Sequence, residues 1–274
     1  MTESGIGAVR RSLARQLREA RLKSGVTYQH MKDVHLASKS AWARYENGQV
    51  RPGVAMVRYA CEVFKVAPEK RDLLISLAEQ ADEPTWWEQK GRGLPTTPGF
   101  VMYLEMESFA SQIQVFSPLA VPGLIQSPGY QHEQFAVTPG LTTSTAARLA
   151  EVRTTRQTET IGRARLSFVI GEEVLARQVG GAEGMRDQVA FMRGLDERDD
   201  VEIRVLPFAV GAHPGGRGEF NLLTFPDGSE EPPLVYVEGY LSGQYSSDPE
   251  VVADLADRFA VLHSSAVPMK EFLT

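Results

Sequence analysis

The chain has 274 residues, 42% hydrophobic and 23% charged, which is typical of a globular protein with room for two domains. No apolar run approaches the ~18 residues that span a bilayer, the N-terminal stretch has no apolar signal core, and a single cysteine excludes an internal disulfide, so we expect a cytoplasmic protein without a membrane partner. Residues 1–82 contain 14 Lys and Arg against 9 Asp and Glu, whereas the remainder contains 15 against 26, which favours a basic module for a polyanion joined to an acidic module.

Helical spacing of apolar residues predicts five short helices in the first eighty residues. Gly25 suits the left-handed end of the first helix, Thr27 and Ser38 are N-cap types for the second and third, and Pro52 is a suitable first residue for the fourth. The predicted ranges are about 9–24, 28–34, 39–47, 52–64 and 70–80. A tight turn between the second and third helices indicates a helix-turn-helix, whose third helix can enter the major groove of DNA.

Trp42 stands in the middle of the third helix, where it could contact a ligand or belong to the core. It shares a helical face with Tyr45, while Lys39, Ser40 and Arg44 lie largely off that face. The period therefore favours the core, with Trp42 holding the basic face at its angle.

Residues 25–48, GVTYQHMKDVHLASKSAWARYENG, resemble without a gap the Cro/cI-like helix-turn-helix of xenobiotic-response-element (XRE) repressors. The positions that agree are Gly25, Thr27, Met31, Ser38, Ser40, Tyr45, Glu46, Asn47 and Gly48. The resemblance implies an all-α five-helix DNA-binding domain, which we place at residues 8–82.

Three residues depart from the family pattern. Tyr28 replaces a glutamine that contacts phosphate, Lys32 replaces a small residue between the two helices, and Leu36 replaces the glycine of the turn. A leucine forced to positive φ would cost about 1–2 kcal/mol, so we expect a reshaped turn or a longer second helix.

The resemblance also implies which residues contact DNA. Lys39, Ser40 and Arg44 are the candidates for base edges, and Ala43 is a candidate for apolar contact with a thymine methyl group. The candidates for phosphate contacts are Tyr28, Asn47 and Arg51. The alternative for each basic residue is an ordinary solvated charge.

Residues 83–99, rich in proline and glycine, form a predicted linker. Trp86 and Trp87 are unusual in a free linker; they are expected to dock it on a domain, with a partner-binding anchor as the alternative.

Residues 100–274 predict an α+β domain with a small sheet of about four strands. The predicted strands are ARLSFVIGE, VEIRVLPF, EFNLLTF and LVYVEGY, and the predicted helices are YLEMESFASQI, SPGYQHEQFAV, TSTAARLAEVRTTRQTETIG, GGAEGMRDQVAFMRGLDE and DPEVVADLADRFAVLHSSA. The glycine-rich segment 211–220 reads as a hairpin-like connection, with a ligand lid carrying His213 and Arg217 as the alternative.

This half also resembles a known family. The segments FSPLAVPGLIQSPGY, VGGAEGMRDQVAFM and VEIRVLPFAVGAHPGGRGEFNLLTFPDG are similar to a C-terminal domain of uncharacterised function that follows such a helix-turn-helix in actinomycete regulators. Those regulators are often encoded beside a small protein that antagonises them. The combination implies a transcriptional regulator, which we expect to be controlled through residues 100–274 as a regulatory and dimerisation domain. A homodimer is expected because one helix-turn-helix covers only half of an operator.

No pattern of catalytic residues is evident in the chain. The five histidines have no metal-ligand spacing with Cys61 or an acidic pair, and there is neither a nucleophile elbow nor a Walker loop. We expect no enzyme activity, no metal and no cofactor, and the ligand-binding residues stay unknown.

The sequence therefore predicts a sequence-specific DNA-binding transcriptional regulator that binds double-stranded DNA as a homodimer and is controlled by a small protein antagonist or a ligand. The alternative is an antitoxin-like module whose main task is to bind a small partner protein.

Overall fold

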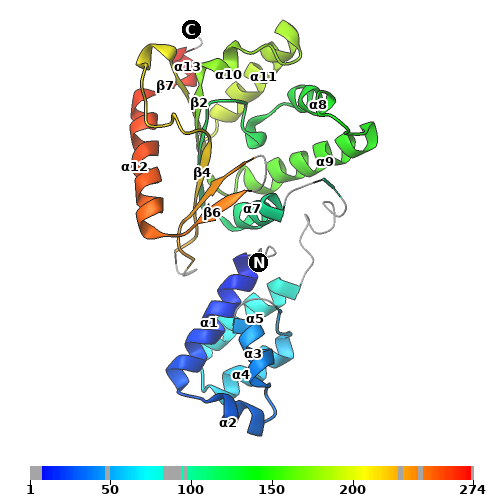
Figure 1. The fold of residues 1–274 in the computed structure, drawn as a ribbon, viewed down its shortest axis with the longest axis vertical. Helices are drawn as coiled ribbons and strands as arrows, with labels where there is room; N and C mark the ends of the chain where they lie inside the picture. The colour runs from blue at the N-terminus through cyan, green and yellow to red at the C-terminus, as the bar shows by residue number, and fades with distance from the viewer. Residues whose placement is uncertain are drawn as a thin grey trace. The chain divides into compact units, whose positions relative to one another are not determined.

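The structure is a computed structural model that describes residues 8–46, 50–82, 94–95, 98–227, 231–239 and 243–272. Its contacts divide the chain into two compact units, one containing the first five helices and the other containing a mixed sheet with its helices (Figure 1). Asn47, Trp86 and Trp87 lie outside the described residues, as does most of the predicted linker.

The first unit is entirely helical, as the apolar spacing predicts. Its helices are α1 (Ala8–Ser24), α2 (Tyr28–Asp33), α3 (Lys39–Glu46), α4 (Val54–Val63) and α5 (Pro68–Asp82). Thr27 caps α2 by accepting the amide of His30, and Ser38 caps the start of α3 by accepting the amide of Ala41. The fourth helix begins at Val54 rather than Pro52, because Gly53 is its N-cap residue.

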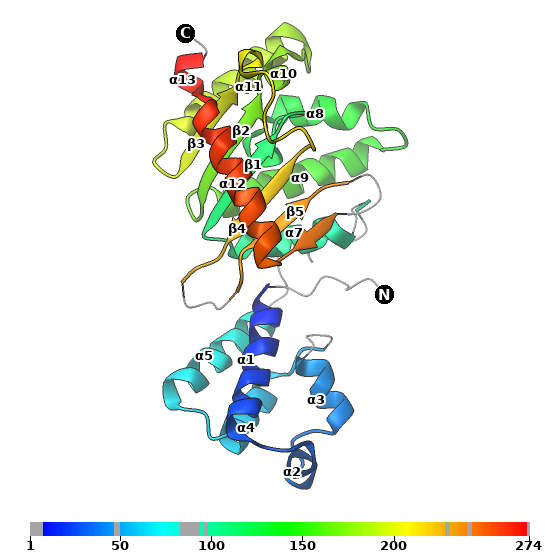
Figure 2. The ribbon, with the colours of Figure 1, turned by 60° about the vertical axis from the view of Figure 1, so that its left-hand side comes forward.

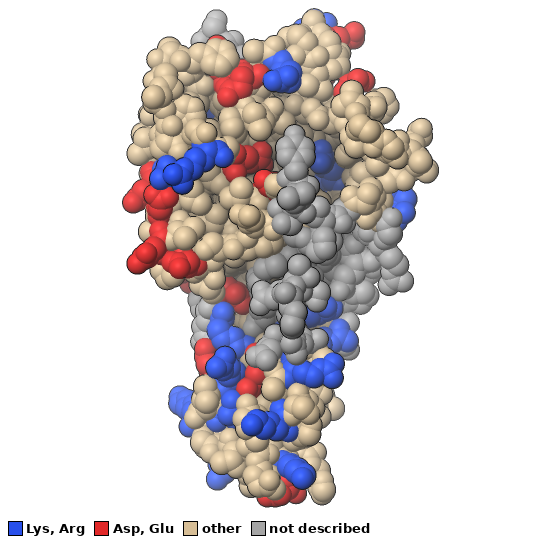
Figure 3. All heavy atoms as spheres, viewed as in Figure 1, with Lys and Arg blue, Asp and Glu red and all other residues tan. Residues whose placement is uncertain are grey.

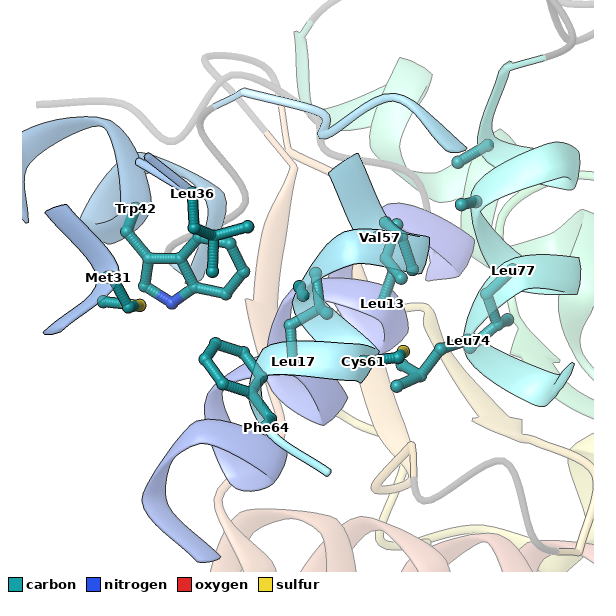
Figure 4. Packing of buried hydrophobic residues seen from close by; sticks show 13 residues of the cluster. Leu13, Leu17, Met31, Leu36, Trp42, Val57, Cys61, Phe64, Leu74 and Leu77 are labelled. Carbon is teal, nitrogen blue, oxygen red and sulfur yellow. The ribbon is translucent and has the colours of Figure 1, made fainter. Parts of the chain in front are cut away.

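A single hydrophobic core joins these helices. Trp42, Met31 and Leu36 pack together at one side of it, and Leu13 and Leu17 of α1 meet α4 and α5 at its centre (Figure 4). All five side chains are at most 2% exposed. At ~25 cal/mol per Å² of apolar surface, each such side chain contributes about 1.5–3 kcal/mol relative to an exposed position.

The second unit is built on a seven-stranded sheet with the order β6-β5-β4-β1-β2-β3-β7. The strands are β1 (Gln112–Ser117), β2 (Arg165–Gly171), β3 (Val201–Leu206), β4 (Phe220–Thr224), β5 (Leu234–Val237), β6 (Gln244–Ser246) and β7 (Val267–Pro268). Strands β1, β2 and β3 are parallel, and the remaining pairs are antiparallel. Parallel neighbours need crossover connections, and helices supply them here.

Helices cover both faces of this sheet. The helices are α7 (Pro98–Phe109), α8 (Pro128–Ala136), α9 (Thr143–Thr160), α10 (Glu172–Ala176), α11 (Gly181–Asp196), α12 (Pro249–Ser265) and α13 (Met269–Phe272), with short 3₁₀ turns η1 (Gly123–Ile125) and η2 (Phe208–Val210). Helix α12 lies on one face, and α8 and α9 lie on the other (Figures 1 and 2). Phe259 and Leu262 of α12 pack on Phe116 and Val169 of the sheet.

The α+β class is confirmed, but the sheet is larger than predicted. The segment from Tyr103 to Ile113 is not one helix, because α7 ends at Phe109 and β1 begins at Gln112. The connection 211–220 is not a hairpin, because β1 and β2 separate β3 from β4 in the sheet. This loop instead lies against the α12 side, where Arg258 donates to the carbonyl of Pro214 and His213 lies edge-on to Phe116.

Candidate DNA-binding surface

The turn between α2 and α3 accommodates Leu36 without strain at that residue. His35, one position earlier, takes the left-handed conformation at φ 56°, and Leu36 turns into the core. The amide of Leu36 donates to the carbonyl of Met31 at 2.9 Å, and the amide of His35 donates to that of Lys32 at 3.1 Å. These two bonds form a Schellman helix end with a histidine where glycine is common, so the turn keeps the length of the family pattern.

Lys32 does not separate the two helices. Its side chain is exposed, while the neighbouring Met31 is fully buried between α2 and α3. The lysine therefore adds a positive charge to the surface of α2 rather than a bulky group to the interface.

Trp42 belongs to the core, as its period predicts. Its side chain is 0% exposed, and its ring meets Phe64 and Tyr45 edge-on at centroid distances of 5.3 and 5.8 Å. The indole Nε1 donates a 2.7 Å hydrogen bond to Glu46 Oε1. A buried indole N–H needs such an acceptor, and Glu46 one turn later on the same helix supplies it. The packing of the Trp42 ring on Phe64 and the rest of the core is what orients α3.

Glu46 is the polar centre of this region. Arg21 of α1 donates to both of its carboxylate oxygens, at 2.5 and 2.9 Å, and the hydroxyl of Tyr28 lies 3.4 Å from Oε2. The bond with Glu46 raises the pKa of Arg21. Carboxylate, guanidinium and indole together tie α1 to α3, so the angle of α3 is set by a charge-assisted network as well as by apolar packing.

The candidates for base contacts lie on the outer side of α3. The side chains of Lys39, Ser40 and Arg44 are exposed, and Ala43 is half-buried. Residues four apart are neighbours on a helix surface, so Ser40 and Arg44 form one row, with Lys39 and Ala43 beside it. The helix therefore presents a narrow basic and hydroxyl-bearing face to solvent.

The phosphate candidates are placed differently. Tyr28 is half-buried, and the charged groups of Arg21 and Lys39 lie 4.6 and 5.6 Å from its ring centroid. Its hydroxyl faces the carboxylate of Glu46. Arg51 is exposed but donates to the carbonyl of Ala81 at the end of α5. Asn47 lies outside the described residues.

Sequence reasoning missed the contact between Arg21 and Glu46. Their separation of 25 residues leaves no local pattern, whereas the bond between Trp42 and Glu46 follows from a spacing of four. Arg21 was visible only as one of several arginines on the first helix.

Basic side chains gather on the face of the helical unit that Figure 3 shows. Exposed cations of this unit include Lys32, Lys39, Arg44 and Arg51. A surface of one sign attracts a polyanion at long range and speeds its association.

Two family models match the chain. A helix-turn-helix domain model matches residues 12–74, and the model of a domain of unknown function, DUF5753, matches residues 100–273. The chain belongs to the DUF5753 family. No curated protein and no solved structure matches it. The helix-turn-helix match supports a DNA-binding regulator. Helix α3 is the second helix of that motif, and its outer side is exposed.

The DUF5753 domain shows no metal centre in the part that the structure describes, where no three His, Cys, Asp or Glu side chains could hold an ion. None of the described helices is long and apolar enough to cross a membrane.

Proposed function

We propose that this DUF5753 protein is a sequence-specific transcriptional regulator of the XRE type, related to those of actinomycetes, which reads DNA through α3. The observation that carries the proposal is the anchored helix itself. Trp42, Glu46 and Arg21 fix α3 from inside the domain while Lys39, Ser40 and Arg44 stay exposed on its outside. A rigid support with an exposed basic face is the arrangement that direct readout requires.

The regulator is proposed to act as a homodimer. One helix-turn-helix covers only half of an operator, and two copies bound one helical turn apart supply both affinity and symmetry. Control passes through the DUF5753 domain, by a small protein antagonist or by a ligand. The protein has no catalytic task in this proposal, and its ligand, chromosomal DNA, places it in the cytoplasm.

The test is binding of the full chain to its own upstream DNA and to a scrambled duplex across a salt series. We expect a preference of about 10³-fold or more for the upstream DNA, and loss of most of that preference in Lys39→Ala/Arg44→Ala. Each lost bidentate contact with a base is worth about 1–3 kcal/mol of discrimination.

The matched control removes two cations elsewhere in the same domain. Arg58 and Arg71 are exposed on α4 and α5, so Arg58→Ala/Arg71→Ala loses the same charge without touching α3. This variant should keep the preference. Equal, steeply salt-dependent binding of both duplexes by the wild type would refute sequence readout and would favour the antitoxin-like alternative, in which the main partner is a small protein.

A further inference from the structure

The DUF5753 domain contains a cavity of about 420 Å³ on the α9 side of its sheet. Its floor is one row of side chains across four strands: Phe168, Val115, Asn221 and Tyr236 are successive register partners on β2, β1, β4 and β5. Residues of α7, η1, α8 and α9 form the walls. The volume lies in the range of natural small-molecule sites, about 300–1,000 Å³.

Aromatic rings line much of this cavity. Tyr103 of α7 stacks on Tyr236 with a centroid distance of 4.6 Å, and Phe100 stacks on Tyr103 at 6.2 Å. Phe135 of α8 and Phe168 of the floor complete the set. The guanidinium of Arg156 lies 5.5 Å from the ring centroids of Phe100 and Tyr103. Aromatic rings and guanidinium planes both stack on a flat ring, so this lining favours a flat ligand.

Two arginines of α9 enter the cavity, but only one of them has a carboxylate partner. Arg156 donates to both oxygens of the buried Glu107, at 2.7 and 2.6 Å. Arg153 donates instead to the neutral amide oxygen of Gln126, with its guanidinium 5.2 Å from the ring of Phe135. Among the described residues no carboxylate lies within ion-pair distance of Arg153.

Burial, and next the neighbouring Arg156, lower the pKa of Arg153 to about 10, although the charge of Glu107 acts in the opposite direction, so the group stays charged at neutral pH. A cation held by a neutral amide next to a second guanidinium is a site for an anion. The absence of a side chain at Gly123 leaves room for both guanidinium groups, since a Cβ there would lie 3.1 Å from Arg156 Nη1 and 3.5 Å from Arg153 Nε.

The sheet side of the cavity carries acceptors. Glu219 accepts a 2.8 Å hydrogen bond from the hydroxyl of Ser117, and Glu238 accepts one from the hydroxyl of Tyr236. Each carboxylate has further lone pairs for an N–H or O–H donor. The cavity is therefore aromatic in its walls, cationic on α9 and acceptor-rich on the sheet.

We propose that this cavity binds a small, flat aromatic molecule that carries an anionic group, with the ring against Phe100, Tyr103 and Phe135 and the anion on Arg153. An N–H or O–H donor on the ring would meet Glu219 or Glu238. The shared chemistry covers aromatic carboxylates and aromatic phosphates such as nucleotides. The inference deepens the proposed function, on which its regulatory meaning rests, because it names a ligand class for the regulatory domain.

The first probe is 8-anilinonaphthalene-1-sulfonate, titrated into the full chain without DNA and followed by fluorescence. Its matched partner is N-phenyl-1-naphthylamine, the same ring system without the sulfonate. We expect the wild type to bind the sulfonate at least about tenfold more tightly. In Arg153→Gln the Kd of the sulfonate should rise by about 10- to 100-fold, the loss of one charge-assisted contact, while that of the neutral dye stays within about twofold.

Three variants separate the site from general effects. Arg148→Gln removes an exposed arginine of the same helix that does not line the cavity, and should leave the sulfonate Kd unchanged. Arg153→Lys keeps the charge and should restore much of the preference. Phe100→Leu, which changes no charge, should weaken both dyes and provides the test if Arg153→Gln does not fold. Equal binding of the two dyes by the wild type, or an unchanged sulfonate Kd in Arg153→Gln, would overturn the proposal.

Competition then distinguishes the sources of the anion. Displacement of the sulfonate by tryptophan or indole acids would identify a carboxylate ligand, and displacement by nucleoside monophosphates would identify a phosphate ligand; displacement by neither would overturn the assignment to these classes. All of these measurements exclude DNA, so they can succeed when the operator test fails. Conversely, a protein that reads its operator but shows no preference for the sulfonate refutes the cavity alone.

Discussion

The clearest energetic consequence of the structure is expected at Glu46. Replacing Glu46 with alanine removes the hydrogen-bond acceptor of the Trp42 indole and both bonds from Arg21. The side chains of Arg21 and Glu46 are 12% and 5% exposed, so the pair is close to fully buried. Breaking a buried pair from one side costs about 3–5 kcal/mol, a large part of the 5–15 kcal/mol that typically separates folded from unfolded domains. Tyr28, at 3.4 Å, adds little.

The measurement is urea unfolding of the full chain in a Trp86→Phe/Trp87→Phe background, where the fluorescence of Trp42 reports on the helical domain. The matched variant is Glu46→Gln, whose amide oxygen can still accept from the indole and should limit the loss to about 1–2 kcal/mol. A loss below about 1 kcal/mol in Glu46→Ala, or equal losses in both variants, would refute the view that this network holds α3. Operator binding should weaken in the same order as stability.

Two further predictions concern backbone strain and charge. His35→Gly should raise the free energy of unfolding by about 0.5–1 kcal/mol, because it relieves about 1–2 kcal/mol of left-handed strain and costs less than that in added flexibility of the unfolded chain. Gly25→Ala, at φ 68°, should lower the free energy of unfolding. Changes of the same sign for both variants in urea unfolding would contradict the prediction. Burial raises the pKa of Glu219, so the folded state binds this proton more tightly than the unfolded state does. Stability is therefore highest below the ordinary pKa of a glutamate and falls as the pH rises through the raised pKa. Glu219→Gln should therefore raise Tm at neutral pH and have little effect at about pH 4. The control is Glu159→Gln, which changes an exposed carboxylate. A change in Tm that is the same at every pH would show that the buried charge of Glu219 is not what lowers the stability.

Local signals predicted the helical domain well. Capping by Thr27 and Ser38, the left-handed Gly25 and the inward face of Trp42 each depend on residues a few positions apart, and each is confirmed. The reshaped turn was expected from Leu36, but sequence alone could not assign the strain to His35. That choice depends on Leu36 reaching the core beside Met31.

The sheet was predicted less completely because its pairing is distant. Strand β1 begins two residues after α7 ends, so the predicted helix ran on through Gln112 and Ile113, the first two residues of the strand. Strand β7 has only two residues, too few to give a pattern. No local pattern predicts that β3 and β4 are not neighbours, because the strands that lie between them in the sheet, β1 and β2, come from earlier in the chain. The DNA-contact residues remain predictions from resemblance, and the cavity had no signal in the sequence.

The floor of that cavity has a consequence for the order in which the chain folds. Its row joins Val115 on β1 to Tyr236 on β5, and Tyr103 reaches Asn221 across 118 positions. Pairings of this sequence separation form late, whereas compact helical units with local contacts fold early. On a chain that emerges from the ribosome N-terminus first, the helices that carry Lys39 and Arg44 can therefore be complete while the pocket has no floor. Under the proposed function, the DNA-binding helices of a nascent chain would therefore form before the cavity proposed for the small molecule.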